Sequence, residues 1–166
     1  MMLFFSIVLF LILLLISIED ISKLIIPNYL CLSGSCIGLI YIAIKLGLKN
    51  PQNLLKEELI HLAAGLSALI IMILIKIISE KITNRICLGL GDAKLSFMGG
   101  IWLGFHGILI VLMMSYLSAG LFSILGRLTM RIKEFQPFPF APFISLFIYA
   151  VWILGEDWWI QNFLPL

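Results

Sequence analysis

The chain has 166 residues, of which 62% are hydrophobic and 12% charged, and its mean hydropathy is +1.16. Soluble domains carry about 25% charged residues, so this composition excludes an ordinary soluble domain and is typical of a polytopic membrane protein. The formal net charge of +2 is too small to indicate a nucleic acid partner.

The order of apolar segments predicts an all-α, polytopic transmembrane helical bundle of about six spans. A span needs about 20 apolar residues, so six spans use most of the chain and leave only short loops. We therefore expect one membrane-embedded domain over residues 1–166, with the lipid bilayer as its surroundings and no soluble domain. The predicted spans are Met1–Ile18, Tyr29–Leu48, Leu59–Ile78, Asp92–Leu103, Ile108–Leu125 and Phe138–Leu154.

Two of these spans need comment. No basic residue precedes the first, and no small-residue cleavage site follows it, so we expect a retained helix instead of a signal peptide. The fourth, Asp92–Leu103, is too short to cross about 30 Å of hydrocarbon as a straight helix. A start near Ile86 would place irregular backbone within the membrane, which is tolerated only where protein or a water-filled cavity surrounds it.

The lysines and arginines indicate the orientation. Eight of the eleven lie in or beside the loops that follow the first, third and fifth spans, and three lie on the other side. Cytoplasmic loops carry the excess of basic residues, which favours an N-terminus that faces outward. Asp20 and Asp92 then lie on the same, cytoplasmic, side. The majority group is Lys23, Lys76, Lys81, Arg85, Lys94, Arg127, Arg131 and Lys133; the other is Lys45, Lys49 and Lys56.

Asp20 and Asp92 are the strongest candidates for a functional site. Acidic side chains in or beside membrane spans are costly to retain, so they are functional candidates by default. The two lie 72 positions apart in the sequence and can meet only if helices bring them together. Two adjacent carboxylates cannot both ionise cheaply, so one keeps a proton while the other accepts one, which supplies the acid and the base of amide hydrolysis.

The residues around both aspartates form local patterns. Pro27 and Asn28 follow Asp20, and Asp92 closes a Gly-x-Gly-Asp pattern that begins with Gly89. We expect Gly89 and Gly91 to let the backbone bend so that Asp92 faces Asp20, and to leave room for an extended peptide.

Each pattern also has a purely structural interpretation. Asp20 can be a solvated helix end, beside a Glu19–Lys23 pair at i,i+4 spacing. Pro27 can simply start the second helix, Asp92 can be an N-cap, and the glycines can serve a turn. Together, on one predicted face of the membrane, these patterns favour the catalytic interpretation.

At these residues the chain resembles the type IV prepilin peptidases and preflagellin peptidases, which are membrane aspartic proteases of the GxGD type. Three stretches carry the resemblance: Asp20 with Pro27-Asn28; Gly89-Leu90-Gly91-Asp92 with Lys94; and Pro137-Phe138-Pro139-Phe140-Ala141-Pro142-Phe143. The resemblance implies that Asp20 and Asp92 are catalytic. It gives positioning roles to Gly89, Gly91, Lys94, Pro27, Asn28, Pro139, Phe140 and Pro142.

The resemblance also implies a function. Such enzymes cleave the leader from type IV pilin, pseudopilin or tight-adherence pilin precursors at the cytoplasmic boundary of the prokaryotic inner membrane. The short segment between Asp20 and Asn28 leaves no room for the domain with paired CxxC motifs found in larger members, so the chain resembles the short, peptidase-only form and N-methylation is not expected. Ala141 stands where the family usually has glycine.

Two other classes of function stay open. One is a small ion-coupled transporter or channel subunit that uses both aspartates, although internal repeats are not evident. The other is a catalytically inactive pilus-assembly factor with the same fold. No metal or cofactor is expected, because Cys31, Cys36 and Cys87 form no CxxC pair and the two histidines have no ligand partner at metal-binding spacing. The sequence leaves the oligomeric state and the particular substrate open.

Overall fold

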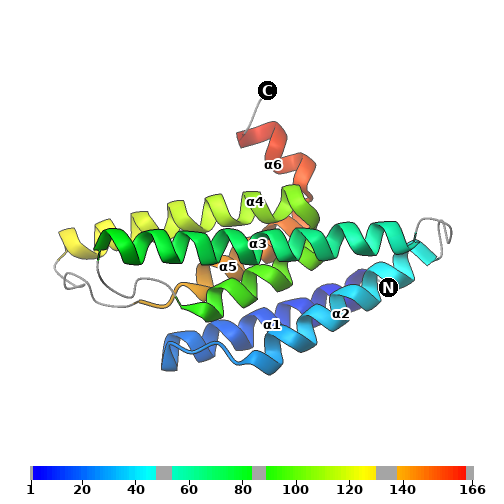
Figure 1. Ribbon diagram of the computed structural model, residues 1–166, viewed down its shortest axis with the longest axis horizontal. Helices are drawn as coiled ribbons and strands as arrows, with labels where there is room; N and C mark the ends of the chain where they lie inside the picture. The colour runs from blue at the N-terminus through cyan, green and yellow to red at the C-terminus, as the bar shows by residue number, and fades with distance from the viewer. Residues whose placement is uncertain (1, 48–53, 84–88, 130–137, 164–166) are drawn as a thin grey trace.

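The computed structural model describes residues 2–47, 54–83, 89–129 and 138–163, and Figure 1 shows these residues as a bundle of helices. The helices are α1 (Met2–Lys23), α2 (Asn28–Gly47), α3 (Leu54–Thr83), α4 (Leu90–Leu128), α5 (Ala141–Leu154) and α6 (Glu156–Phe163). The predicted helical membrane bundle is confirmed, because four of these helices are long and apolar enough to cross a membrane. They are α1 to α4; α5 is apolar but shorter.

The fourth and fifth predicted spans form the two halves of α4, residues 90–103 and 105–128. Gly104 lies between them with φ 75° and ψ −172°, a backbone conformation that is essentially restricted to glycine. The chain reverses there, and the second half returns alongside the first (Figure 1). In agreement, a Cβ built on Gly99 would lie 3.0 Å from the side chain of Ile108 in the second half. Gly107, which in the sequence separates the two predicted spans together with Gly104, lies inside the helix.

Small residues allow the helices to approach closely, as is common in membrane proteins. A Cβ on Gly100 would lie 2.6 Å from the Cα of Gly65, so α3 and α4 touch through their backbones. Gly34 on α2 leaves room for Met98, and its carbonyl accepts a hydrogen bond of 2.9 Å from Trp102 Nε1. These contacts fix the first half of α4 between α2 and α3.

Several helix ends differ from the predicted boundaries. α1 continues one turn beyond Ile18 to Lys23, and α3 extends the predicted third span at both ends. Helices continue into the polar boundary of a membrane, where a hydropathy pattern ends but backbone hydrogen bonding does not. The apolar stretch around Cys31 and Cys36 predicts that both thiols are buried. Cys31 is buried, but Cys36 is exposed, so the prediction is wrong for Cys36. Some residues named in the sequence analysis lie outside the described residues: Met1, Leu48, Lys49, Arg85, Ile86, Cys87, Arg131, Lys133 and Pro137.

One end of the bundle gathers the segments that carry the predicted site residues. Four parts of the chain lie at the left of Figure 1: the connection between α1 and α2, the start of the first half of α4, the end of its second half and the start of α5. α5 packs against both α1 and α4. Residues far apart in sequence are therefore brought together at this end.

Candidate active site

Asp20 lies in the last turn of α1 and points into the bundle. Its side chain is buried, with 6% of the residue exposed. The neighbouring Glu19 lies on a different face, where its Oε2 forms an ion pair with Lys23 Nζ at 2.7 Å. The predicted i,i+4 pair is therefore present, but it involves Glu19 and leaves Asp20 free for another role.

The N-terminus of α5 holds the Asp20 carboxylate. The backbone N–H of Ala141 donates to Asp20 Oδ2 at 2.9 Å, and the N–H of Phe140 also donates to this carboxylate. The first N–H groups of a helix have no partner within the helix, so they suit an acidic side chain. The third sequence pattern thus contributes backbone N–H groups to the site, and Ala141 lies 121 positions after Asp20 in the chain.

The prolines of that pattern explain where α5 begins. The sixth span was predicted from Phe138, but Pro139 lies before the helix and Pro142 lies in its first turn. A proline is well tolerated in the first turn, where its missing N–H costs nothing. Ala141 is fully buried, so the methyl group that replaces the usual glycine packs into the protein and does not line the pocket described below.

Asp92 is the third residue of α4, and its side chain is 7% exposed. The interpretation of Asp92 as an N-cap is wrong, because Gly89 occupies the cap position. The Asp92 carboxylate instead reaches back and accepts a hydrogen bond from the backbone of Gly89. This is one half of a capping box, in which an acidic side chain at the third position satisfies the N–H of the cap.

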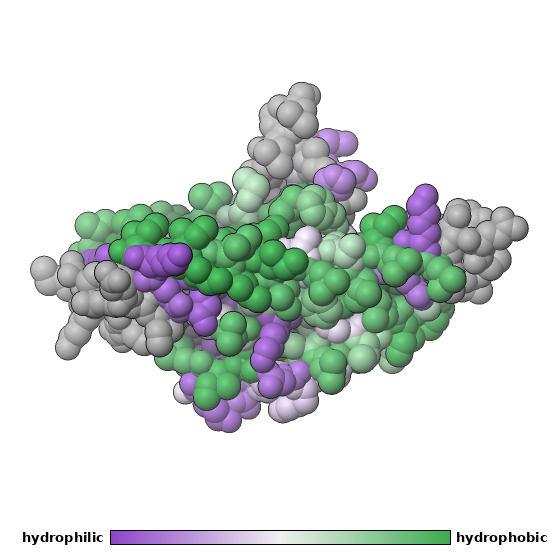
Figure 2. Space-filling view, in the orientation of Figure 1, coloured by the Kyte–Doolittle hydropathy of each residue, from purple (hydrophilic) through white to green (hydrophobic). Residues whose placement is uncertain are grey.

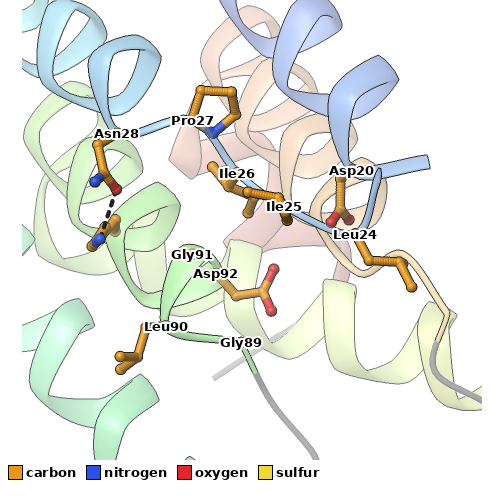
Figure 3. Close-up of a pocket in the computed structure, with 11 residues that line it drawn as sticks. Asp20, Leu24, Ile25, Ile26, Pro27, Asn28, Gly89, Leu90, Gly91 and Asp92 are labelled. Atoms are coloured by element: carbon orange, nitrogen blue, oxygen red, sulfur yellow. Dashed lines mark hydrogen bonds between the residues drawn. The ribbon is translucent and has the colours of Figure 1, made fainter. Parts of the chain in front are cut away.

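Both carboxylates point into one pocket with a volume of about 400 Å³ (Figure 3). It lies between the α1–α2 connection and the first turn of α4. The pocket is open to the outside and is lined by Asp20, Leu24, Ile25, Ile26, Pro27, Asn28, Gly89, Leu90, Gly91, Asp92 and Lys94. Seven of the ten predicted site residues therefore line a single cavity; Pro139, Phe140 and Pro142 do not.

The two glycines of the Gly-x-Gly-Asp pattern have different roles. A Cβ on Gly91 would lie 2.8 Å from the Cβ of Ile26, so only glycine lets the α1–α2 connection pack against the start of α4. Gly89 has φ −78° and more space, since a Cβ would meet Asp92 Oδ2 at 3.4 Å. Neither glycine has a positive φ. The expected bend is therefore not what requires glycine here; close approach requires it at Gly91.

Comparison with known proteins adds a family to this geometry. The model of the type IV leader peptidase family matches residues 7–124, which include both aspartates. The chain belongs to this family. It is also 32% identical over 89 residues to the prepilin leader peptidase/N-methyltransferase of Aeromonas hydrophila. That match covers 51% of the chain but only 30% of the relative. No solved structure matches the chain.

In this member of the leader peptidase family, four residues connect α1 to α2, and the first has a strained backbone. Leu24 has φ 54°, a left-handed conformation that costs about 1–2 kcal/mol for a residue other than glycine. Its N–H donates to the Asp20 carbonyl at 2.9 Å, which ends α1 with a left-handed turn. Pro27 precedes α2, and its carbonyl accepts the first hydrogen bond of that helix from Leu30 at 3.2 Å.

Lys94 joins the two sides of the pocket. Its Nζ donates to Asn28 Oδ1 at 2.7 Å, shown as a dashed line in Figure 3, so the start of α2 is tied to the first half of α4. The bond is exposed. Together with the Gly91–Ile26 contact, it fixes the α1–α2 connection beside Asp92.

The sequence did not reveal three contributors to the site. Ile26 closes against Gly91, Leu24 ends α1, and Tyr116 on the second half of α4 packs its ring against Phe140 at 5.0 Å. Ile26 and Leu24 belong to an ordinary apolar stretch and gave no signal. Tyr116, a polar aromatic residue in an apolar span, was a signal that could have been used.

Proposed function

We propose that this protein is a membrane aspartic endopeptidase that removes the leader from prepilin-like precursors, such as those of type IV pilins, pseudopilins or tight-adherence pilins. The observation that carries the proposal is the arrangement of Asp20 and Asp92. Two buried carboxylates from different helices face one open pocket in a member of the type IV leader peptidase family.

The chemistry follows from two acids that share one proton. The ionised carboxylate takes a proton from water, and the resulting hydroxide attacks the carbonyl carbon of the scissile peptide bond. The protonated carboxyl group gives its proton to the carbonyl oxygen. When the tetrahedral intermediate breaks down, the C–N bond is cleaved and the leaving nitrogen receives a proton from the pair. The two aspartates act and titrate as one unit.

The proposal also covers the side of the membrane on which the pocket lies and the reactions that the protein catalyses. The distribution of basic residues supports a location of the pocket at the cytoplasmic side of the prokaryotic inner membrane, where a leader is accessible. Because residues 24–27 alone separate α1 from α2, this connection has no room for an inserted domain. We therefore propose peptidase activity without N-methyl transfer.

The test uses the full chain in liposomes and a synthetic precursor: a short basic leader, a glycine before the cut and an apolar helix. Mass spectrometry measures leader release and detects any methylation of the new amino terminus. We expect Asp20→Asn and Asp92→Asn each to lower the rate by at least about a thousandfold, because asparagine keeps the side-chain volume but cannot ionise.

Glu19→Gln is the matched control. Glu19 is adjacent to Asp20 but takes part in a largely exposed ion pair with Lys23, and such pairs are worth about 0–1 kcal/mol. Its rate should stay within about twofold of the unchanged protein. Cleavage by either asparagine variant at a rate close to that of the unchanged protein would contradict the proposal. An inserted but wholly inactive protein would instead support the pilus-assembly factor without catalytic activity.

A further inference from the structure

A second pocket of about 400 Å³ lies on the flank of the bundle, between α3 and the second half of α4. Figure 2 shows that the surface over these helices is largely hydrophobic. The pocket, called the flank groove below, is apolar throughout. Its lining residues are Ile71, Ile75, Leu109, Leu112, Met113, Tyr116 and Leu117.

The flank groove has the shape that a helix can occupy. Ile71 and Ile75 are four residues apart on α3, and Leu109, Met113 and Leu117 repeat every four residues on α4. Rows of side chains at this spacing form the ridges between which another helix packs. Met113 and Leu117 are 52% and 65% exposed, so nothing in the described part of the chain covers that side.

Tyr116 connects the flank groove to the aspartates. Its hydroxyl donates inward to Met72 Sδ at 3.2 Å, which leaves the ring as part of the groove wall. The ring packs on Phe140, whose backbone N–H donates to Asp20. One end of the groove therefore lies at the level of the aspartates.

The other end leads away from the aspartates into the depth of the bundle. Leu109 precedes Tyr116 by seven residues toward Gly104, which corresponds to about 10 Å along the helix axis. A peptide cut at Asp20 and Asp92 must enter the bilayer from their level if an apolar helix follows the cut. The flank groove starts at that level and runs in that direction.

We infer that the flank groove binds the apolar helix of the precursor while the residues before it reach Asp20 and Asp92. This inference rests on the proposed function and names the surface that selects its substrates. The feature selected is an uncharged, apolar helix that enters between α3 and α4. Membrane lipid is the alternative occupant, and the test separates the two.

The test compares two synthetic probes in the liposome assay. The long probe has the leader, the junction and the apolar helix; the short probe ends after the junction. Met113→Trp and Leu117→Trp fill the groove, so we expect the ratio of kcat/KM for the long probe to that for the short probe to fall about tenfold. Matched controls are Leu11→Trp on α1 and Leu146→Trp on α5, which are 50% and 62% exposed before substitution. Their ratios should change by less than about twofold.

A cross-linking measurement gives an independent result. Cys31, Cys36 and Cys87 are replaced by serine in the Asp92→Asn protein, and one cysteine is introduced at Met113 or, as a control, at Leu146. A cysteine in the apolar helix of the long probe should form a disulfide with position 113 and not with position 146.

The possible outcomes are distinct. If the unchanged protein cleaves neither probe, the proposed function fails. If it cleaves both but groove and control variants give equal ratios, or if both positions cross-link equally, the substrate helix lies elsewhere. If neither position cross-links and the ratios are unchanged, the flank groove holds lipid and the inference is overturned.

Discussion

The Asp20 carboxylate is held by a distant part of the chain, whereas that of Asp92 is held by the start of its own helix. Asp20 accepts hydrogen bonds from the backbone of Phe140 and Ala141, and Asp92 accepts one from Gly89, three residues earlier. The orientation of Asp92 therefore depends on one helical turn. The orientation of Asp20 depends on the docking of α5, so half of the candidate active site forms only when the bundle is assembled.

The largest effect that tests this contrast is a difference in stability between two alanine variants. Asp20→Ala removes the acceptor of the buried Ala141 N–H, and a buried donor without a partner costs about 1–3 kcal/mol. Asp92→Ala affects Gly89, which is exposed, so water can replace the carboxylate and the change should stay below about 1 kcal/mol. Thermal unfolding in detergent measures both. Equal shifts in Tm would mean that α5 does not depend on Asp20.

The sequence predicted one of these two arrangements better than the other. Asp92 and Gly89 lie in one short pattern, so their proximity could be anticipated, although the capping role was assigned to the wrong residue. The partners of Asp20 are backbone N–H groups 121 positions away, which have no side-chain signature. The prolines around Phe140 were recognised as a motif, but their effect is to place the start of α5.

The fold shows the same limit. Apolar runs predicted the helices and the separation near Gly104, because burial in lipid leaves a strong composition signal. Which helices pack against each other was not predictable from the sequence. The packing depends on contacts such as that of Gly65 with Gly100, where neither residue has a side chain. Helix ends also differed, because α1 and α3 continue beyond their apolar runs.

The next effect contrasts the two glycines that precede Asp92. In Gly91→Ala, the new methyl group meets Ile26, and relief requires the α1–α2 connection to move away from Asp92. Such overpacking costs about 1–3 kcal/mol, and we expect leader release to fall about tenfold. Gly89→Ala adds only an ordinary contact and should stay within about threefold. Rates from the liposome assay decide this, and Ile26→Ala should restore part of the activity of Gly91→Ala.

The smallest effect concerns the exposed bond between Lys94 and Asn28. Lys94→Met keeps the length of the side chain but removes the donor, and an exposed hydrogen bond of this kind contributes about 1 kcal/mol or less. We expect a loss of about threefold in kcat/KM and a similar loss for Asn28→Ala. The double variant should lose no more than either single one, because both remove the same bond. A loss of about a hundredfold from Lys94→Met alone would instead assign the lysine a direct part in the reaction.

The reversal at Gly104 also determines how this protein meets the bilayer. The first half of α4 and the whole of α5 have 14 residues each, or about 21 Å of helix, whereas α1 has 22 residues and about 33 Å. Hydrocarbon about 30 Å thick matches α1 but not the two short segments that carry Asp92 and the N–H groups facing Asp20. Local thinning of the membrane is one of the ways in which a bilayer accommodates such short segments. Where the membrane thins, headgroups and water come closer to the two carboxylates, so the length of these two helices bears on how water reaches the candidate active site.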